Sequence, residues 1–377
     1  MRSTSRSSRK GAPRSASSPT SRVFLHIGAP MTGSSYIRDC LARHWRRLAR
    51  SGVLYPPSHL GHDGGHLDAV LDVLELSTTG RAQSIGAWDR VAETARDWRR
   101  GTVVVSHELL SDASQEQVKR AVSSFGNAEV HVVYATCGLA RQIPLAWQEW
   151  VRNGGTASFA TYVNRVVARD PHRMSKVFWQ SHDLGEVLDR WSAFVPGERI
   201  HVLTVPDSEN QDAVLWDRFA QTIGIDPRKF KAGSDSRRVP LGLAENEVLR
   251  LLNRQTGQAG DPQRLERVRR ALGAGRGTRP ALSVVHAEWL SEETDRLVGA
   301  VKDGGYAVVG DTCELVAGPD ALAVTDDHVI ASTDSVLAAQ TRTLAALAGL
   351  TAHAQGPAGL HRRALRELAS VSRLRRR

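Results

Sequence analysis

Short apolar runs recur along the first two thirds of the chain, each bounded by polar residues or glycine. Aliphatic and β-branched residues dominate these runs, which is typical of strands buried on both faces of a sheet. The pattern predicts strands at residues 23–27, 103–105, 131–134 and 200–205, with a late edge strand at 308–309.

Helical periodicity lies between these runs and takes over after about residue 240. Apolar residues spaced by three or four positions predict helices at 37–48, 184–191, 214–219, 243–252, 284–301 and 335–350. Alternating strands and helices imply a central parallel sheet covered on both faces. We therefore predict one α/β domain over residues 22–312, a disordered basic tail at 1–21 and a helical C-terminal extension at 313–377.

Positive charge is concentrated at the two ends of the chain. The formal net charge is +10, yet residues 1–22 carry six Lys or Arg and no acid, and residues 361–377 carry seven Arg against Glu367. A domain that binds nucleic acid by counterion release holds its basic patch in the folded body. We therefore expect no specific nucleic-acid partner. Solvated arms are the favoured interpretation of the tails, and an anionic partner for them is the alternative.

The cysteines and the apolar runs bear on the compartment. Cys40, Cys137 and Cys313 lie far apart and form no CxxC pair, which fits a reducing compartment without disulfides or structural zinc. No apolar run is long enough to span a membrane, and the N-terminus lacks the apolar core of a secretory signal. The sequence thus predicts a cytoplasmic protein without a membrane span.

A glycine-bracketed segment, Gly28-Ala29-Pro30-Met31-Thr32-Gly33-Ser34-Ser35, joins the first predicted strand to a helix. A turn at this place aims backbone N–H groups at an anion, and the helix N-terminus adds partial positive charge. Ser34 and Ser35 can cap the helix or donate hydroxyls to a phosphate. They replace the Lys-Ser/Thr pair of nucleotide triphosphatases, so that signature fails. A capped strand-to-helix turn without a ligand remains the alternative.

Two tracts carry a resemblance to a known family. Residues 23–36 resemble the opening of sulfotransferases, whose loop reads PKTGTT or PKTGSS. Residues 139–149 (LARQIPLAWQE) resemble the LARQLPSAWQE hallmark of a bacterial branch, where an Arg-Asp pair precedes it. Weaker echoes lie at Trp191 and at 241–247, so the resemblance covers most of residues 22–310. It implies a P-loop NTPase-like three-layer sandwich, and sulfuryl transfer from 3′-phosphoadenosine-5′-phosphosulfate (PAPS) to a hydroxyl or amine.

The resemblance also implies which residues bind the donor: Gly28, Met31, Thr32, Gly33, Ser34, Ser35, Cys137, Arg141 and Leu145. Three of them depart from the family pattern. Met31 replaces the lysine at the transferring group, Cys137 the arginine that grips the 3′-phosphate, and Leu145 the serine that shares that phosphate. None of the new side chains offers the lost polar contact.

Arginines elsewhere in the sequence leave a second interpretation open. Arg141 lies four residues after Cys137, and Arg237 and Arg238 precede Leu241. Guanidinium groups bind phosphates well, so a rearranged anion site built from these residues is the alternative to a lost one.

The acceptor base is predicted at the carboxyl edge of the sheet. His107 and Glu108 follow the strand at 103–105, where α/β folds place their sites. The resemblance implies a His or Glu base that deprotonates the acceptor, so this pair is the catalytic candidate. An ordinary helix-capping turn is the alternative.

Other candidates have weaker support. His59, His62, Asp63 and His66 are spaced as metal ligands can be, but no cysteine joins them, and we expect no metal. Contact with a small-molecule or glycan acceptor suits this loop better. Two helices carry the remaining candidates. One has a solvated face of arginines: Arg43, Arg46, Arg47 and Arg50. The other places Trp147 and Trp150 in the core and is kinked or started by Pro144.

Three functions follow from these observations. The first is a working sulfotransferase with a remodelled donor site, and the second is an inactive relative that binds or regulates. The third, another P-loop enzyme such as a kinase, needs the lysine that the loop lacks. The sequence favours a sulfotransferase-family protein with weak or no binding of PAPS.

Overall fold

A parallel six-stranded sheet forms the centre of the computed structural model, in the order β2-β3-β1-β4-β5-β7. The structure describes residues 21–56, 64–76, 84–98, 101–231, 241–256, 268, 272, 279–318, 321–323 and 331–354. The strands are β1 (Arg22–Gly28), β2 (Val53–Leu54), β3 (Thr102–Ser106), β4 (Glu129–Thr136), β5 (Ile200–Thr204) and β7 (Ala307–Val309). The predicted strands and the late edge strand are confirmed, and so is the α/β fold class.

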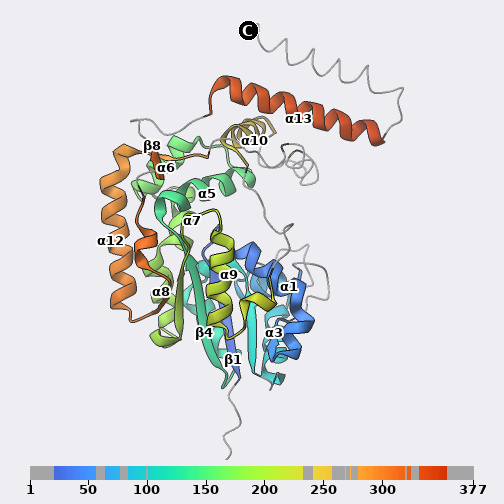
Figure 1. The fold of residues 1–377 in the computed structure, drawn as a ribbon, viewed down its shortest axis with the longest axis vertical. Coiled ribbons are helices and arrows are strands. Elements are labelled where there is room, and N and C mark those ends of the chain that lie inside the picture. Colours follow the sequence, from blue (N-terminus) through green and yellow to red (C-terminus); the bar gives the residue numbers. More distant parts are fainter. Residues whose placement is uncertain are drawn as a thin grey trace, which may run out of the picture.

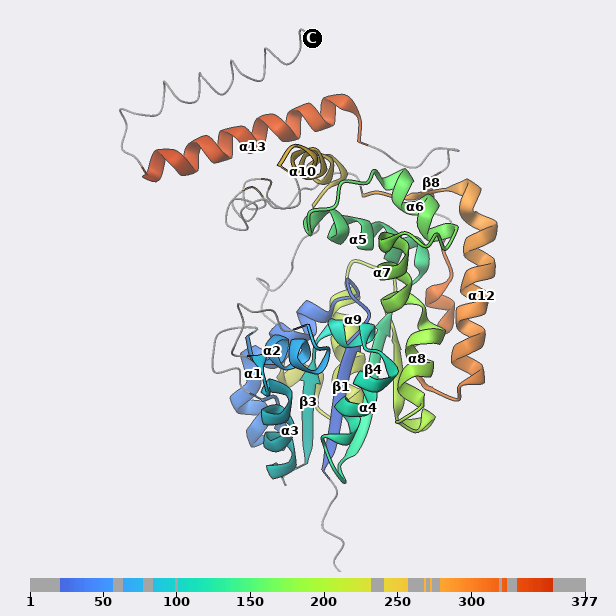
Figure 2. The same ribbon diagram turned by 180° about the vertical axis from the view of Figure 1, so that it is seen from behind.

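Helices cover both faces of this sheet, giving three layers (Figures 1 and 2). On β1, Val23, Leu25 and Ile27 face one apolar cluster while Phe24 faces the other, as the two-residue period of a strand requires. One cluster includes residues of α1 (Ser34–Arg50) and α9 (Gln211–Thr222). The other includes residues of α3 (Ala87–Asp97), α4 (Gln115–Ser123) and α8 (Leu184–Ser192).

A helical region lies beyond the carboxyl edge of the strands (Figure 1). Its helices are α5 (Leu139–Arg152), α6 (Phe159–Val167), α7 (Arg173–His182), α10 (Leu243–Thr256) and α13 (Thr333–Ala354), and α12 (Ala287–Asp303) runs from this region down the side of the molecule next to α8. Pro144 lies inside α5 and does not start it. A second small sheet pairs β6 (Leu282–Ser283) with β8 (Leu322–Ala323), and α2 (Gly64–Val73) packs on α3.

The tails at 1–20 and 355–377 lie outside the described residues, and the domain boundary near residue 312 stays a prediction. Among the described helices, none is long and apolar enough to cross a membrane.

Buried histidines should make this fold sensitive to acid. His26 is fully buried beside the Ser106 hydroxyl at 2.7 Å, and burial lowers the pKa of His26 to about 3. Burial also lowers the pKa of His182 to about 4. Below about pH 6.5 the unfolded chain binds both protons while the native state does not, so stability is lost as the pH falls from 6.5 towards 3–4. At about 1.4 kcal/mol per pKa unit, each imidazole removes at most ~3–5 kcal/mol.

Urea unfolding between pH 8 and pH 4.5 measures this loss. We expect the midpoint to fall steadily below pH 6.5. A His26→Asn variant keeps a hydrogen-bonding side chain that does not titrate, so its midpoint should fall less. Parallel pH curves for the variant and the parent chain would rule out His26 as a source of acid sensitivity.

Candidate functional site

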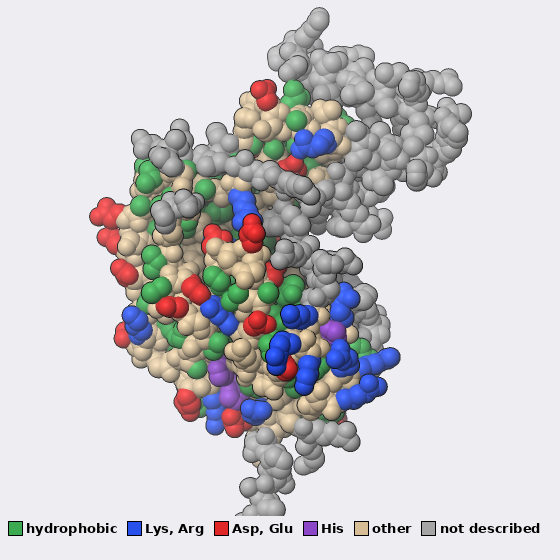
Figure 3. Space-filling model, in the orientation of Figure 1, with side chains coloured by type: hydrophobic (Ala, Val, Ile, Leu, Met, Phe, Trp, Pro, Cys, Tyr) green, Lys and Arg blue, Asp and Glu red, His purple; other side chains and the backbone are tan. Residues whose placement is uncertain are grey.

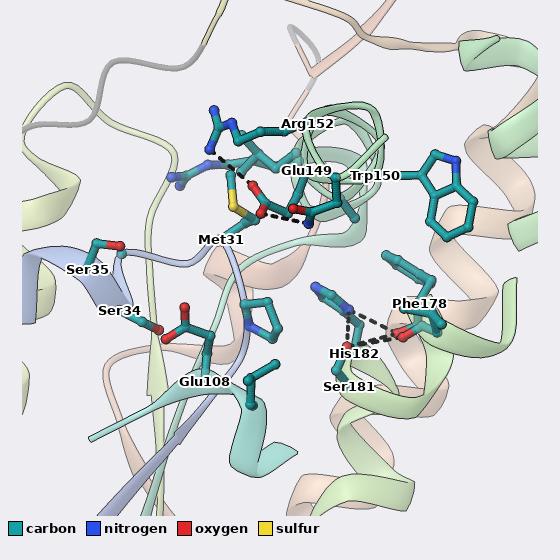
Figure 4. Close-up of a pocket in the computed structure, with 18 of the residues that line it drawn as sticks. Met31, Ser34, Ser35, Glu108, Glu149, Trp150, Arg152, Phe178, Ser181 and His182 are labelled. Atoms are coloured by element: carbon teal, nitrogen blue, oxygen red, sulfur yellow. Dashed lines mark hydrogen bonds and ion pairs between the residues drawn. The ribbon is translucent and has the colours of Figure 1, made fainter. Parts of the chain in front are cut away.

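A cavity of about 1100 Å³ opens at the carboxyl edge of the sheet. Figure 4 shows its walls: Met31, Ser34 and Ser35 of the loop after β1 on one side, Glu149, Trp150 and Arg152 of α5 on another, and Phe178, Ser181 and His182 of α7 on a third. The chain leaves β1 towards β2 and β3 on one side, and β4 and β5 lie on the other. The cavity therefore lies where α/β folds usually bind ligands.

The cavity wall includes only some of the predicted site residues. Those that line it are Met31, Gly33, Ser34, Ser35, Glu108, Arg141 and Leu145. Gly28, Thr32, His107 and Cys137 are not among the residues that line it. Met31 and Leu145, two of the three residues that depart from the family pattern, thus line the cavity together with the loop after β1. The third, Cys137, does not.

The loop after β1 is a tight turn with an open amide surface. Gly28, Met31 and Gly33 have φ values of 138°, 63° and 102°, and the Thr32 hydroxyl donates to the Ala29 carbonyl at 2.6 Å. The φ of Gly33 favours glycine, and a Cβ there would also lie 2.5 Å from Leu215 Cδ2, so that the leucine side chain would have to move. The Tyr36 and Ile37 amides donate to the Gly33 carbonyl, whereas the Gly33, Ser34 and Ser35 amides have no acceptor within the described residues, so the backbone can still bind an anion.

The two loop serines are already engaged. The Ser34 hydroxyl donates to the Ala29 carbonyl at 3.3 Å, and the Ser35 hydroxyl accepts from Arg38 Nη2 at 3.3 Å. Arg38 also forms an ion pair with Glu108. Burial alone would raise the pKa of Glu108, but Arg38 and then His107 hold that pKa below its ordinary value. Glu108 therefore places a fixed negative charge in the cavity and is a weak base.

His107 caps a turn. Its Nδ1 accepts from the Leu109 amide at 3.2 Å at the start of η2 (Glu108–Asp112), which is the alternative that the sequence left open. Both ring nitrogens of His66 also have hydrogen-bond partners: Nδ1 accepts from the Ser106 amide, and Nε2 lies 3.1 Å from the Pro56 carbonyl. His59, His62 and Asp63 lie outside the described residues. No group of three potential metal ligands occurs in the part of the chain that the structure describes.

The Cys137-Gly138 pair is enclosed by protein. Cys137 is 4% exposed and packs in the cluster that includes Ala135 and Val205, and burial raises the pKa of its thiol to about 11. A Cβ on Gly138 would lie 2.6 Å from the Leu315 carbonyl oxygen. The segment η7 (Thr312–Leu315) therefore covers the position where the family pattern has aspartate. An Arg-Asp pair does not fit here without movement of η7.

The charges around the cavity do not favour a large anion. Four arginines line it, Arg141, Arg152, Arg173 and Arg279, against six carboxylates, Glu108, Asp112, Glu149, Asp207, Glu209 and Asp212. Arg141 Nη1 donates to the Pro206 carbonyl at 3.2 Å, and Arg152 pairs with Glu149 at 3.0 Å. Arg237 and Arg238 lie outside the described residues. Among the described residues that line the cavity, carboxylates therefore outnumber arginines.

Several cavity residues were not predicted from the sequence. His182 is 4% exposed, and its Nδ1 must donate to the Phe178 carbonyl at 2.9 Å, which leaves a lone pair on Nε2. Nε2 completes no hydrogen bond among the described residues. Burial lowers the pKa of the ring by more than the Pro30 carbonyl raises it. Asp112 lies beside Ser181, and burial raises the pKa of Asp112 to about 6 although Arg190 opposes this. These groups converge from segments about 70 residues apart, so no local motif predicts them.

The prediction that both tryptophans of α5 belong to the core holds for Trp147 and in part for Trp150, which packs against the core cluster from its edge. Trp147 is 1% exposed and packs on Phe159 with ring centroids 5.2 Å apart, as predicted. Trp150 is half-buried and lines the cavity, with the Arg173 guanidinium 6.0 Å from its ring centroid. Three residues turn a helix by about 300°, so Trp150 sits at the edge of the buried stripe and closes the cavity.

Comparison with known proteins yields a weak structural likeness. No protein-family model and no curated protein matches the chain. Among solved structures, the chain is similar to a sulfotransferase from Alicyclobacillus acidocaldarius, with 13% identity, a TM-score of 0.35, and coverage of 64% of this chain and 98% of that one. A likeness this weak carries no inference about activity.

Proposed function

We propose that this chain is a sulfotransferase-like protein whose cavity binds PAPS weakly or not at all, and that it acts as a binding or regulatory protein. One observation carries the proposal: Met31 lines the cavity at the place of the loop lysine, in a wall with more carboxylates than arginines. PAPS carries a phosphate and a phosphosulfate, so it needs compensating cations.

The expected loss of affinity is large. Hydrogen bonds to charged groups contribute about 1.5–3 kcal/mol each, so three missing contacts remove roughly 4–8 kcal/mol after allowance for non-additivity. At about 1.4 kcal/mol per decade, this is on the order of 10³–10⁶ in affinity. The buried Cys137 supports this view, since its thiol does not line the cavity.

Turnover would suffer separately from binding. Transfer of a charged group depends mostly on positioning and on charge stabilisation at the leaving oxygen. The Met31 thioether supplies no charge there. Glu108, held as a carboxylate by Arg38, is poorly suited to take a proton from an acceptor.

A working sulfotransferase with a remodelled donor site is the second candidate. The open amides at Gly33, Ser34 and Ser35 and the half-buried Arg141 favour it, because both can bind phosphate without the family lysine. Its donor would be PAPS, and its acceptor a small molecule or glycan. No metal is needed by either candidate.

Titration calorimetry with adenosine 3′,5′-bisphosphate, the desulfated donor product, separates the two. We expect no heat of binding and no thermal shift up to millimolar nucleotide. Micromolar affinity, weakened in an Arg141→Gln variant, would instead establish the remodelled donor site and overturn the proposal.

A further inference from the structure

Basic side chains gather on one side of the molecule, over the second half of α1 and the segment after α9 (Figure 3). Here this surface is called the basic face. It consists of the exposed residues Arg43, Arg46, Arg47, Arg50, Arg228, Lys229 and Lys231. The cavity is lined by the first turn of α1, so the basic face lies beyond the cavity on the same helix.

The two segments form one continuous surface. His44 Nε2 lies 2.8 Å from the Lys231 carbonyl oxygen, which ties α1 to the segment after α9. The Arg47 guanidinium lies 5.5 Å from the ring centroid of Phe230, whose side chain is buried between the two segments. The charges of both segments therefore lie on one surface.

Most of this charge is uncompensated within the molecule. In the described part of the chain, none of the four α1 arginines of the basic face has an ion-pair partner. Asp226 engages Arg228 at 3.1 Å, and α1 itself carries the single acid Asp39. The helix dipole favours Arg47 and Arg50 in the last turn, but it does not explain the other cations. Like charges this close repel one another, so an anionic partner would relieve a cost.

An exposed tryptophan indicates what kind of anion fits. Trp45 borders the basic face next to Arg46: 37% of its surface is exposed, and the Arg46 guanidinium is 5.0 Å from its ring centroid. Tryptophan prefers the boundary between lipid and water, and basic residues beside it add attraction to anionic lipid; the apolar face of α1 itself is buried in the protein, so the contact would be made by exposed side chains alone. Nucleic-acid platforms need an open ring for base stacking, and Arg46 already covers one side of the Trp45 ring.

We propose that the basic face docks on the surface of an anionic lipid bilayer, with Trp45 at the headgroup level. The contact is peripheral and reversible, because one aromatic side chain buries little apolar area. Each basic residue near an anionic surface strengthens binding by about fivefold, and salt screens this attraction within about 10 Å. Docking is independent of what the cavity binds.

Vesicle flotation with the full chain tests the proposal. We expect binding to vesicles of phosphatidylglycerol and phosphatidylcholine, none to phosphatidylcholine alone, and release at 0.5 M salt. A variant carrying R46Q, R47Q, R228Q and K229Q should bind at least thirtyfold more weakly with an unchanged melting temperature. Its matched control neutralises four arginines of the C-terminal tail: R373Q, R375Q, R376Q and R377Q. This control should bind within threefold of the parent.

Fluorescence gives a second readout. Brominated anionic lipid should quench part of the tryptophan emission of the parent chain, and Trp45→Phe should remove that part. Equal losses of vesicle binding in the two charge variants would show that charge anywhere on the chain suffices, and would overturn the proposal. So would binding of a single-stranded oligonucleotide through the basic face by a chain that ignores anionic vesicles.

Discussion

Replacing Asp183 with alanine is expected to lower the free energy of unfolding by about 1.5–3 kcal/mol, the contribution of hydrogen bonds to a charged group, because the arginines left behind stay accessible to solvent and paired with Glu293. Asp183 is 1% exposed at the junction of α7 and α8. Its carboxylate accepts from Arg169 at 3.0 Å and from Arg296 of α12 at 2.7 Å, and it caps α8 through the Glu186 amide. One side chain thus joins three segments of the chain.

Urea unfolding can separate the two roles of this carboxylate. Asp183→Asn keeps a good helix cap but removes the charge, so it should cost less than alanine by about 1 kcal/mol. Asp226→Asn, at an exposed ion pair with Arg228, is the matched control and should leave the midpoint unchanged. If Asp183→Ala lowers the free energy of unfolding by no more than the loss of the helix cap explains, the ion pairs with Arg169 and Arg296 contribute nothing and the prediction is wrong. The adjacent His182 lines the cavity, so the same variant should also loosen that wall.

The central strands could be predicted because burial on both faces makes them contiguous apolar runs. The whole of Val23–Ile27 is buried, and β1 pairs in parallel with both β3 and β4. The strands β2, β6 and β8 have two residues each, which is too short for any periodic signal. Their pairing depends on tertiary contacts.

Cys137 is a position where the family pattern and strand geometry lead to different expectations. The match to the family pattern predicted this position at the donor phosphate. On β4, however, Val133 and Ala135 both face the cluster of α1 and α9, and the same two-residue period continues to Cys137. The thiol therefore packs away from the cavity, and η7 closes over Gly138 from a distant part of the chain.

Residues of the cavity that come from several segments could not be predicted. The loop after β1 was found because glycines and a strand-to-helix transition leave a local signal. Asp112, Trp150 and His182 have ordinary neighbours in sequence, and each becomes notable only when α5, α7 and η2 pack around one space. Burial then creates their unusual properties, such as the raised pKa of Asp112.

Restoring the cationic contact should create nucleotide binding where the parent chain has none. Met31 and Leu145 both line the cavity, so a Met31→Lys and Leu145→Ser variant returns two of the three family contacts. Lysine is unbranched like methionine and fits the same backbone conformation, φ 63°. At about 1.5–3 kcal/mol per contact, affinity for adenosine 3′,5′-bisphosphate should rise by roughly 10²–10⁴.

The third reversion should fail for a structural reason. Cys137→Arg would place a guanidinium in an apolar cluster without a partner, so we expect the variant to unfold and not to bind. Calorimetry on the double variant should show binding that weakens with salt, while Met31→Gln with Leu145→Ala, which matches the size without the charge, shows none. If the double variant binds no nucleotide while remaining folded, the loop after β1 is not a donor site in this protein. If the variant with Met31→Gln and Leu145→Ala also gains affinity for the nucleotide, the volume of the side chains, and not the lysine charge, limits binding.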